Sequence, residues 1–432
     1  MLAGFTHKGP ERKGRSLHSV DESLDELAQL ASSAGAAVEA RLLQSRETVD
    51  AATLIGSGKA DELADLVAAA QADSVIFDCD LSPTQQRNLE KIIGVKVLTR
   101  TQLILDIFAG RARTREGRLQ VELAQLKYLL PRLTGQGMAL SRLGGGIGTR
   151  GPGETKLETD RRRIARRIRK IEKDIEAVRT GRAIHRAKRQ SVPLPLIAMA
   201  GYTNAGKSTL FNRLTGAAVL TDARMFATLD PTIRILPLPS KRKALLSDTV
   251  GFISNLPPTL VQAFRATLEE VTQASLILHV VDCSADHARE HATQVLQVLA
   301  EIGAGETPQL LVLNKADRLA PNREESGVLA HRILGRPADD DRGVGAALVS
   351  ALTGEGRAGL LSLIDAALPF DTVRTERFQI PLAAGADIAL LHSSARVMRE
   401  EYNEWSCEIE AEVPESIREK LARYVVVDQV RK

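Results

Sequence analysis

Apolar residues in the first hundred positions recur at two different spacings. In one segment they recur every three residues, on one face of a helix that we expect to end near Gly35. The residues that form this face are Leu24, Leu27 and Leu30. Residues 75–77 and 95–98 are short apolar runs of the kind that form buried strands, and a helical segment precedes each of them. This alternation predicts a small parallel sheet in a βα domain over residues 1–100, in which the basic positions 4–20 do not resemble a strand.

Two long helices are predicted between residues 101 and 190. One apolar stripe covers residues 121–130 and ends near Pro131, because proline cannot continue a helix. A second helix is expected over residues 156–185, about 45 Å long at 1.5 Å per residue. The two would form a hairpin, joined over residues 135–153 by a loop that contains eight glycines. Such a loop is costly to order and lets the backbone approach a partner closely, while nearby basic side chains contact phosphates. Those side chains are Arg132, Arg142, Arg150 and Lys156.

Pro193 and Pro195 mark a boundary, after which a new α/β domain begins. We predict this domain over residues 194–369 and a small C-terminal α+β domain over residues 370–432. The C-terminal part has the pattern of strand, helix, strand and helix, over residues 378–380, 387–402, 407–413 and 415–424. The predicted fold class is therefore α/β, with a mostly parallel central sheet that helices cover on both faces. The small βα domain with its helical hairpin precedes it, and the α+β domain follows.

The composition is that of an ordinary globular protein. Of 432 residues, 44% are hydrophobic and 26% are charged. The three cysteines (Cys79, Cys283 and Cys407) lie far apart and have no histidine at zinc-site spacing, which excludes a disulfide framework. No apolar run approaches the roughly 20 residues of a membrane helix, and residues 1–20 lack the apolar core of a signal peptide. We therefore expect a cytoplasmic protein with no membrane span, able to associate with a membrane only peripherally.

The net charge of +4 conceals an uneven distribution along the chain. Residues 100–189 contain 23 Lys/Arg and 9 Asp/Glu, a net charge of +14, so the remainder carries −10. A run of basic residues alone is usually a solvated helix face. The size of this asymmetry instead favours docking of the basic middle segment onto a polyanion.

The motif G-x-x-x-x-G-K-S follows the buried apolar run of residues 194–200 and precedes a helix. In this context it predicts a loop whose backbone N–H groups surround phosphates at a helix N-terminus. Lys207 should reach the β- and γ-phosphates, and Ser208 should ligate Mg²⁺. The loop residues predicted to bind the nucleotide are Gly201, Tyr202, Thr203, Asn204, Ala205, Gly206, Lys207 and Ser208.

Two later motifs specify the nucleotide. Asp248, Thr249, Val250 and Gly251 end a second strand, where Asp248 would hold Mg²⁺ through water and the Gly251 N–H would sense the γ-phosphate. A third strand leads into Asn314, Lys315, Ala316 and Asp317.

The carboxylate of Asp317 can accept hydrogen bonds from both N1–H and the exocyclic amine of guanine. Adenine offers a lone pair at N1 and would leave the carboxylate unpaired, so such a site discriminates strongly. After a further strand, Ser350, Ala351 and Leu352 would add a backbone donor to guanine O6. Because four motifs occur in this order, we expect GTP or GDP as the ligand.

Two switch segments are expected beside the phosphates. The first contains Phe226, Ala227, Thr228, Leu229 and Asp230, followed by Pro231 and Thr232. A threonine there would complete the Mg²⁺ shell when the γ-phosphate is present, and we favour Thr228 over Thr232. Residues 252–267 would form the second switch. The residues assigned to catalysis are Lys207, Thr228 and Gly251.

The residue after Gly251 is Phe252, where Ras-like enzymes usually have a glutamine that orients the attacking water. Because a phenyl ring cannot do this, unaided hydrolysis should be slow. A partner or a cation would then complete the site, and Asn204 could coordinate K⁺ beside the phosphates. His287 and His291 have the spacing of a metal-binding pair, but without a third ligand nearby we expect them on a solvated face.

Several segments resemble the signature of the HflX GTPases. They are GGGIGTRGPGETKLE at residues 144–158 with DRRR at 160–163, SPTQQRNLE at 82–90, the loop 201–208 and the switch 226–230. The resemblance covers about residues 20–430. It implies a ribosome-associated GTPase, expected as a monomer, whose N-terminal region docks on the large subunit and its rRNA. In that family, members are linked to the splitting or rescue of stalled and stress-inactivated ribosomes.

Three functions remain open at this point. The first is a switch driven by GTP that binds the ribosome and is released after hydrolysis, stimulated by the ribosome. The second is a GTPase that acts on tRNA or in RNA modification, although no catalytic group for that chemistry occurs outside the GTPase motifs. The third is a non-catalytic RNA-binding protein in which GTP is structural.

Overall fold

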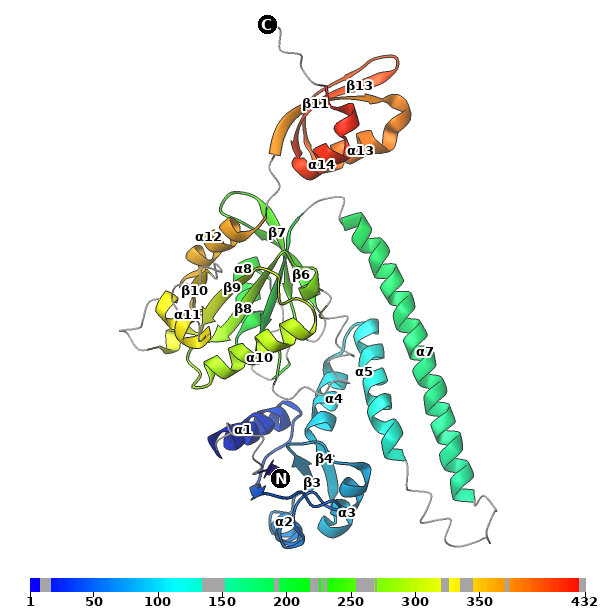
Figure 1. Cartoon of the computed structure of the whole chain (residues 1–432), viewed down its shortest axis with the longest axis vertical. Helices are drawn as coiled ribbons and strands as arrows, with labels where there is room; N and C mark the ends of the chain where they lie inside the picture. Colours follow the sequence, from blue (N-terminus) through cyan, green and yellow to red (C-terminus); the bar gives the residue numbers. More distant parts are fainter. Residues whose placement is uncertain are drawn as a thin grey trace.

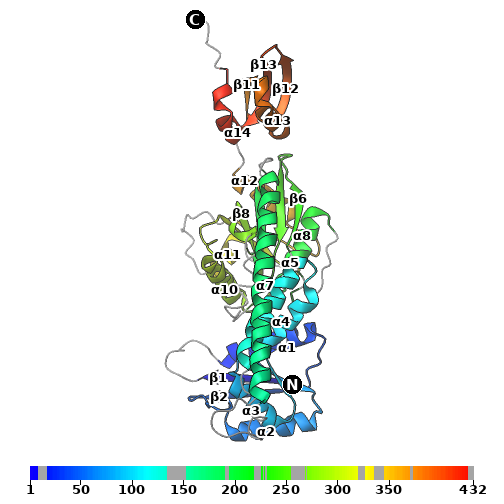
Figure 2. The ribbon, with the colours of Figure 1, turned by 90° about the vertical axis from the view of Figure 1, so that its right-hand side faces the viewer.

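The computed structural model describes residues 1–7, 17–133, 152–189, 194–217, 225–226, 228, 231–253, 268, 270–319, 326–334, 345–369 and 373–426. Three sheets occur in these residues, one in each of three units that follow one another along the long axis of the molecule (Figure 1). The N-terminal unit lies at one end, the unit with the largest sheet lies in the middle and the C-terminal unit lies at the other end. The long helix α7 (Pro152–Arg189) runs beside the first two units, as the rotated view also shows (Figure 2).

The N-terminal unit contains a four-stranded parallel sheet in the order β2-β1-β3-β4. Its strands are β1 (Leu2–His7), β2 (Arg41–Arg46), β3 (Ser74–Phe77) and β4 (Lys96–Thr99), and its helices are α1 (Leu17–Ser33), α2 (Ser57–Ala69), α3 (Pro83–Ile93) and α4 (Arg100–Arg111). Two of these helices begin with a capping box, in which Ser82 pairs with Gln85 and Thr99 with Gln102. The leucine face predicted in this unit is confirmed, because Leu24, Leu27 and Leu30 of α1 are all buried.

The expectation that positions 4–20 contain no strand is wrong. β1 pairs with β2 on one side and β3 on the other, in registers such as Leu2↔Arg41 and Leu2↔Ile76. Leu2 and Ala3 are buried in the sheet. The apolar part of this strand is only a few residues long and basic residues follow it, so its pattern is weak. β1 nevertheless lies inside the sheet, where its backbone N–H and C=O groups bond to strands on both sides and so stabilise it without a long apolar pattern.

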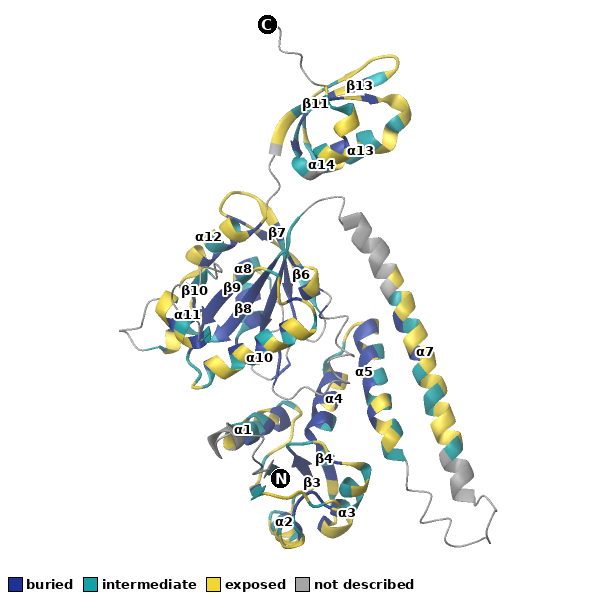
Figure 3. Cartoon of the chain, viewed as in Figure 1, coloured by how far each residue is buried: buried dark blue, intermediate teal, exposed yellow. Residues whose placement is uncertain are grey.

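The helices α5 (Arg115–Leu129) and α7 pack against each other, and a short 3-10 turn, η2 (Leu130–Leu133), ends the first of them. Ile171 and Ile175 of α7 are buried, and ion pairs such as Arg167–Glu122 and Lys127–Glu172 join the two helices. Most of the other described residues of α7 are exposed, as its colouring shows (Figure 3). The glycine-rich loop predicted to join the helices lies almost entirely outside the described residues.

The middle unit has a six-stranded sheet in the order β10-β9-β8-β5-β7-β6, in which only the β6–β7 pair is antiparallel. Its strands are β5 (Leu196–Gly201), β6 (Thr232–Pro237), β7 (Lys243–Asp248), β8 (Leu276–Asp282), β9 (Gln309–Asn314) and β10 (Ala346–Leu348). Its helices are α8 (Lys207–Thr215), α10 (Ala288–Glu301), η3 (Ala316–Arg318), α11 (Ser326–Leu334) and α12 (Arg357–Ala367). The central strands are buried (Figure 3), as expected for a mostly parallel sheet that lies between helices, so the predicted α/β fold class is confirmed.

The C-terminal unit is a three-stranded antiparallel sheet in the order β11-β13-β12. It consists of β11 (Val373–Pro381), η4 (Leu382–Ala384), α13 (Gly385–Ser394), β12 (Arg396–Tyr402), β13 (Ser406–Pro414), α14 (Glu415–Lys420) and η5 (Ala422–Tyr424). The single helix predicted over residues 387–402 is therefore wrong. The helix ends at Ser394, Ala395 adopts an extended conformation, and the next residues pair with β13. Pairing with a neighbouring strand overrides their local helix pattern.

Candidate functional site

A cavity of about 410 Å³ lies where β5, β7 and β9 end. Parallel strands bring residues from distant motifs to one edge of their sheet. The cavity collects predicted residues from every motif, among them Lys207, Ser208, Thr228, Gly251, Asn314 and Asp317. Thr203, Asn204, Gly206, Phe226, Thr249, Lys315, Ala351 and Leu352 complete the predicted residues that line it.

Close backbone contacts determine the shape of the loop between β5 and α8. Gly206 has φ +90°, and a Cβ atom there would lie 2.3 Å from Asn314 Nδ2. A Cβ atom at Gly201 would lie 2.2 Å from the carbonyl oxygen of Val280. Asn204 also has a left-handed conformation, with φ 60°. Glycine at positions 201 and 206 is therefore required by packing, and the loop leads into the N-terminus of α8, where backbone N–H groups attract anions.

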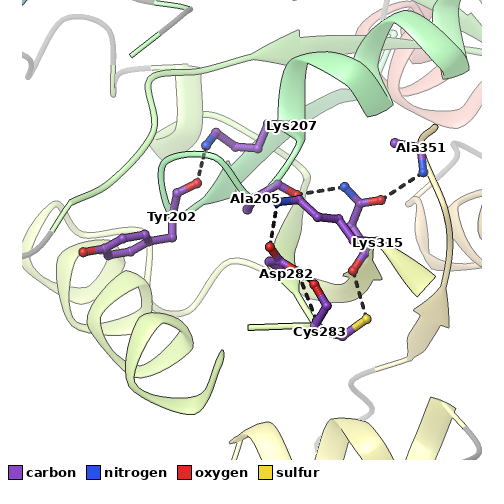
Figure 4. Close-up of polar contacts among 9 residues, drawn as sticks. Tyr202, Ala205, Lys207, Asp282, Cys283, Lys315 and Ala351 are labelled. Atoms are coloured by element: carbon purple, nitrogen blue, oxygen red, sulfur yellow. Dashed lines mark hydrogen bonds and ion pairs between the residues drawn. The ribbon is translucent and has the colours of Figure 1, made fainter. Parts of the chain in front are cut away.

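Lys207 is buried beneath this loop. Its Nζ donates a hydrogen bond to the carbonyl oxygen of Gly201 at 3.0 Å. It donates another to the carbonyl oxygen of Tyr202 at 2.8 Å, which Figure 4 shows. Burial lowers the pKa of Lys207 to about 8, although the charge of Asp248 acts in the opposite direction. A Cβ atom at Gly251 would lie 3.0 Å from the same Nζ, so glycine keeps this corner open. An ammonium group has three donors, and the third can contact an anion in the cavity.

Three side-chain oxygens form a triangle beside Lys207. Ser208 Oγ lies 2.7 Å from Asp248 Oδ2 and 2.8 Å from Thr228 Oγ1, and Thr228 Oγ1 donates to the same carboxylate oxygen at 2.9 Å. Burial raises the pKa of Asp248, against the effect of the hydrogen bond from Ser208. In the described part of the chain, Asp248 Oδ1 is buried without a hydrogen-bond partner. Of the two threonines of the predicted first switch, Thr228 is the one that contacts Ser208, whereas Thr232 is the first residue of β6.

The triangle fits a magnesium ion. Neighbouring ligand oxygens of octahedral Mg²⁺ lie about 3 Å apart, because each metal–oxygen distance is about 2.1 Å. All three groups are oxygen donors, which Mg²⁺ prefers, and the buried carboxylate lacks a full set of partners. Across the residues that the structure describes, no group of three or more His, Cys, Asp or Glu side chains could hold a metal ion by itself.

The other end of the cavity is built around Asn314. Its Nδ2 donates to the carbonyl oxygen of Ala205 at 2.8 Å, and its Oδ1 accepts from the Ala351 N–H at 3.0 Å (Figure 4). Asp317 Oδ1 accepts a hydrogen bond of 2.5 Å from Ser350 Oγ. Asn314 thus joins three predicted motifs. The Ala351 N–H, predicted as a donor to guanine O6, already donates to Asn314 Oδ1. Of the predicted donor segment 350–352, the next residue is Leu352, which is exposed.

Other predicted contact residues have buried side chains. Val250 and Ala316 are in the core, and Thr249 Oγ1 donates to the carbonyl oxygen of Met199. Phe252 is also buried, and its backbone pairs with the phosphate loop: Thr203 N donates to Phe252 O at 2.7 Å. The phenyl ring therefore cannot orient a water molecule in the cavity. Ala227, Leu229, Asp230 and most of the second switch, residues 254–267, lie outside the described residues.

The expectation that both histidines lie on a solvated face is wrong for His291. His291 is not on a solvated face, because its ring stacks on Tyr202 with centroids 3.9 Å apart and an angle of 10° between planes. Burial lowers its pKa. His287 Nε2 lies 2.8 Å from a carboxylate oxygen of Glu22 on α1. His287, directly before α10, therefore contacts the N-terminal unit, whereas His291 of α10 packs against the phosphate loop.

Sequence reasoning missed two partners of the nucleotide-binding motifs, one of Tyr202 and one of Lys315. The Tyr202 hydroxyl donates a hydrogen bond to Glu26 of α1, which also pairs with the buried Arg100. Asp282, the last residue of β8, lies 2.6 Å from Lys315 Nζ (Figure 4). No spacing rule links Glu26 to Tyr202. Asp282, in contrast, directly follows an apolar run in the sequence, and a carboxylate at the end of a buried strand is a recognisable candidate for the nucleotide edge of the sheet.

Comparisons with known proteins agree with this geometry. Three family profiles match, described as GTP-binding GTPase N-terminal (residues 21–109), GTP-binding GTPase Middle Region (residues 111–189) and 50S ribosome-binding GTPase (residues 196–315). The chain is 46% identical to the GTPase HflX of Caldanaerobacter subterraneus subsp. tengcongensis, over 94% of this chain and 91% of that protein. It is 56% identical to the GTPase HflX of Alkalihalophilus pseudofirmus, over 69% of this chain and 70% of that protein.

Solved structures give a weaker comparison. A crystal structure of a GTP-binding protein from the archaeon Sulfolobus solfataricus in complex with GDP is 24% identical, with a TM-score of 0.44. It covers 85% of this chain and 97% of its own. The described helices of the present structure include none that is both long and apolar enough to cross a membrane.

Proposed function

The chain belongs to the HflX family of GTPases, and from this premise we propose that it acts on the ribosome. It binds GTP and GDP with Mg²⁺, docks as a monomer on the large ribosomal subunit through rRNA, and uses GTP binding and hydrolysis to split or rescue stalled or stress-inactivated ribosomes. The family profile described as a 50S ribosome-binding GTPase supports this assignment. A cytoplasmic location at the ribosome follows from it.

The roles of the cavity residues follow from their positions. The N–H groups at the start of α8 and the third donor of Lys207 bind the β- and γ-phosphates. Ser208 and Thr228 would hold Mg²⁺ directly and Asp248 would hold it through water, and the ion would neutralise phosphate charge when bound. The carboxylate of Asp317 accepts from the Watson–Crick edge of guanine, and Ser350 orients that carboxylate through its hydroxyl.

Position 252 does not supply the group that would orient water in the catalytic step. The Gly251 backbone lies beside Lys207 and senses the γ-phosphate through its N–H, and Thr228 changes position with the nucleotide. Because Phe252 is buried, no side chain at that position orients the attacking water. Hydrolysis is therefore slow alone, and the ribosome or a cation supplies what is missing.

The observation that carries the ribosomal assignment is the basic surface of α7. Its exposed basic residues include Arg162, Arg166, Arg169 and Lys173, which recur at intervals of four, three and four positions and so share one side of the helix. At 1.5 Å per residue, successive members are about 4.5–6 Å apart along the axis. This stripe is long, exposed and rich in arginine, as expected for contacts to successive phosphates of an RNA strand.

The experiment compares GTP turnover with and without purified large ribosomal subunits, in K⁺ buffer at moderate salt. We expect strong stimulation by the subunits. The triple variant R162Q/R166Q/R169Q should lose most of it and should lower the slope of log K against log salt by about 2–3, because each phosphate contact contributes about 0.7–0.9. A matched control, R289Q/R357Q/K420Q, removes three exposed basic residues from other helices.

Two outcomes would contradict the proposal. Equal stimulation of the α7 variant and the wild type would exclude the stripe as the docking surface. GTP binding with no stimulation by large subunits would exclude the ribosomal assignment and favour tRNA or another RNA as the activator.

A further inference from the structure

The structure pairs Lys315 of the nucleotide cavity with a residue outside that cavity. Lys315 lines the nucleotide cavity together with Asp317. Its partner, Asp282, lines a separate cavity of about 570 Å³ between α1, α10 and the phosphate loop. Lys315 Nζ and Asp282 Oδ2 are 2.6 Å apart, with only 16% and 19% of the two side chains exposed. The lysine therefore lines the nucleotide cavity while its ammonium group is paired with a carboxylate that lines the second cavity; Figure 4 shows this ion pair.

The backbone places the two residues together. In the parallel pairing of β8 and β9, Asp282 lies opposite Asn314, the residue before Lys315. The Asn314 carbonyl oxygen accepts hydrogen bonds from Cys283 N at 3.1 Å and Cys283 Sγ at 2.9 Å. The ends of the two strands are thus joined at the point where both side chains begin.

Asp282 is held with one carboxylate oxygen directed toward Lys315. Its other oxygen, Oδ1, accepts from the Ser284 N–H at 3.0 Å and from Ser284 Oγ at 2.6 Å. These contacts use one oxygen and leave Oδ2 for the lysine. Ser284 therefore orients the carboxylate independently of Lys315, which restricts the ion pair to one geometry.

Lys315 has a backbone conformation that side chains seldom adopt. Its φ is 65° and its ψ is 35°, in the left-handed region. Such a conformation persists at functional sites when surrounding contacts determine it. Here those contacts are the two hydrogen bonds of the Asn314 side chain and the ion pair to Asp282. The turn directs the chain into η3, which contains Asp317.

We propose that Asp282 is a positioning residue for guanine recognition. It holds the Lys315 ammonium group away from the phosphates, so that the four-carbon stem of Lys315 forms a fixed apolar wall against the base. An unrestrained lysine side chain would lose much of its freedom when the nucleotide binds, and the ion pair removes that freedom in advance. The inference rests on the proposed function, because it requires the base to lie beside Asp317.

The consequence is a selective effect on affinity. Asp282 does not contact the phosphates or the groups beside them, so its loss should raise KM and the Kd for GDP without changing kcat. The D282N variant keeps the size of the side chain and an oxygen that can accept from Ser284. We expect it to weaken GDP binding about tenfold, while kcat at saturating GTP stays within about twofold of the wild type.

A double-mutant cycle tests whether the effect passes through Lys315. K315M keeps an unbranched stem and lacks the charge, so D282N should have no further effect on GDP affinity in a K315M background. The control is D286N, a carboxylate four residues along that lines the same cavity as Asp282. It should bind GDP as the wild type does.

The proposal is overturned if D282N binds GDP as tightly as the wild type, or if the two substitutions add fully in the double variant. If D282N does not fold, S284A provides a milder perturbation and should weaken GDP binding in the same direction. A wrong assignment of the base site would be recognised separately, because D317N would then leave the preference for GTP over XTP unchanged.

Discussion

The ring of Phe108 packs edge-on against the ring of Phe226, with centroids 4.6 Å apart and an angle of 74° between the planes. Phe108 belongs to α4 of the N-terminal unit, and Phe226 belongs to the predicted first switch. Both rings are buried. Beside them, the Met225 N–H donates to Ser33 Oγ of α1 at 2.9 Å. The switch that contains Thr228 is therefore held from one side by the N-terminal unit.

The F108L variant tests whether this contact influences the nucleotide. Loss of the ring should leave Thr228 less firmly placed and lower the affinity for GTP at least fivefold relative to GDP. Its matched control is F77L, because Phe77 is fully buried in the same unit but belongs to a different core cluster. Each substitution should cost about 1–2 kcal/mol of stability, measured by urea unfolding. Equal nucleotide affinities in the two variants would exclude the contact as a determinant of the switch.

Guanine selectivity should depend on the carboxylate of Asp317. In D317N an amide N–H₂ replaces one carboxylate oxygen, so the residue no longer accepts from both the N1–H and the amine of guanine. Xanthine has a carbonyl oxygen in place of that amine and can accept from the new amide. We expect the ratio of the affinity for GTP to the affinity for XTP to be at least about 10³-fold lower in the variant than in the wild type, measured by competition binding. An unchanged preference would show that the base lies elsewhere.

Burial of Lys207 should make the free energy of unfolding of the nucleotide-free protein increase at alkaline pH. Its folded-state pKa of about 8 lies below the ordinary value of 10.5, so the unfolded state binds more protons between these values. Stability therefore rises with pH across this range. Relative to K207M, the wild type should gain about 3 kcal/mol of unfolding free energy between pH 8 and 10.5. Urea unfolding of both proteins gives this difference, and parallel pH curves would contradict the assigned burial.

The sequence allowed the nucleotide end of the fold to be predicted well because its information is local. A strand, a loop and a helix lie within residues 196–215, and each later motif directly follows its own strand. Gly206 and Asn314 are 108 positions apart, yet each is recognisable within its own motif. Their contact follows once parallel strands place both at the same edge of the sheet.

Contacts between the units could not be predicted in the same way. Glu26 and Tyr202 are 176 positions apart, and neither lies in a pattern that indicates a partner. The same limitation explains the error over residues 396–402, whose strand exists through pairing with β13. Side-chain periodicity records which face of an element is buried, but it does not record which neighbour covers that face.

The identity of the monovalent cation should affect turnover through Asn204. This residue is exposed, has φ 60° and lines both the nucleotide cavity and the cavity beside α1. Its amide oxygen could ligate K⁺ next to the phosphates, where a positive charge stabilises the charge that develops during phosphoryl transfer. We expect several-fold faster GTP hydrolysis in K⁺ than in Na⁺ at equal ionic strength. N204G keeps the left-handed backbone accessible but lacks the oxygen, so it should remove the difference, whereas N204D should retain it. Equal rates of the wild type in the two salts would exclude a potassium site at Asn204 and leave the ribosome as the source of the missing catalytic group.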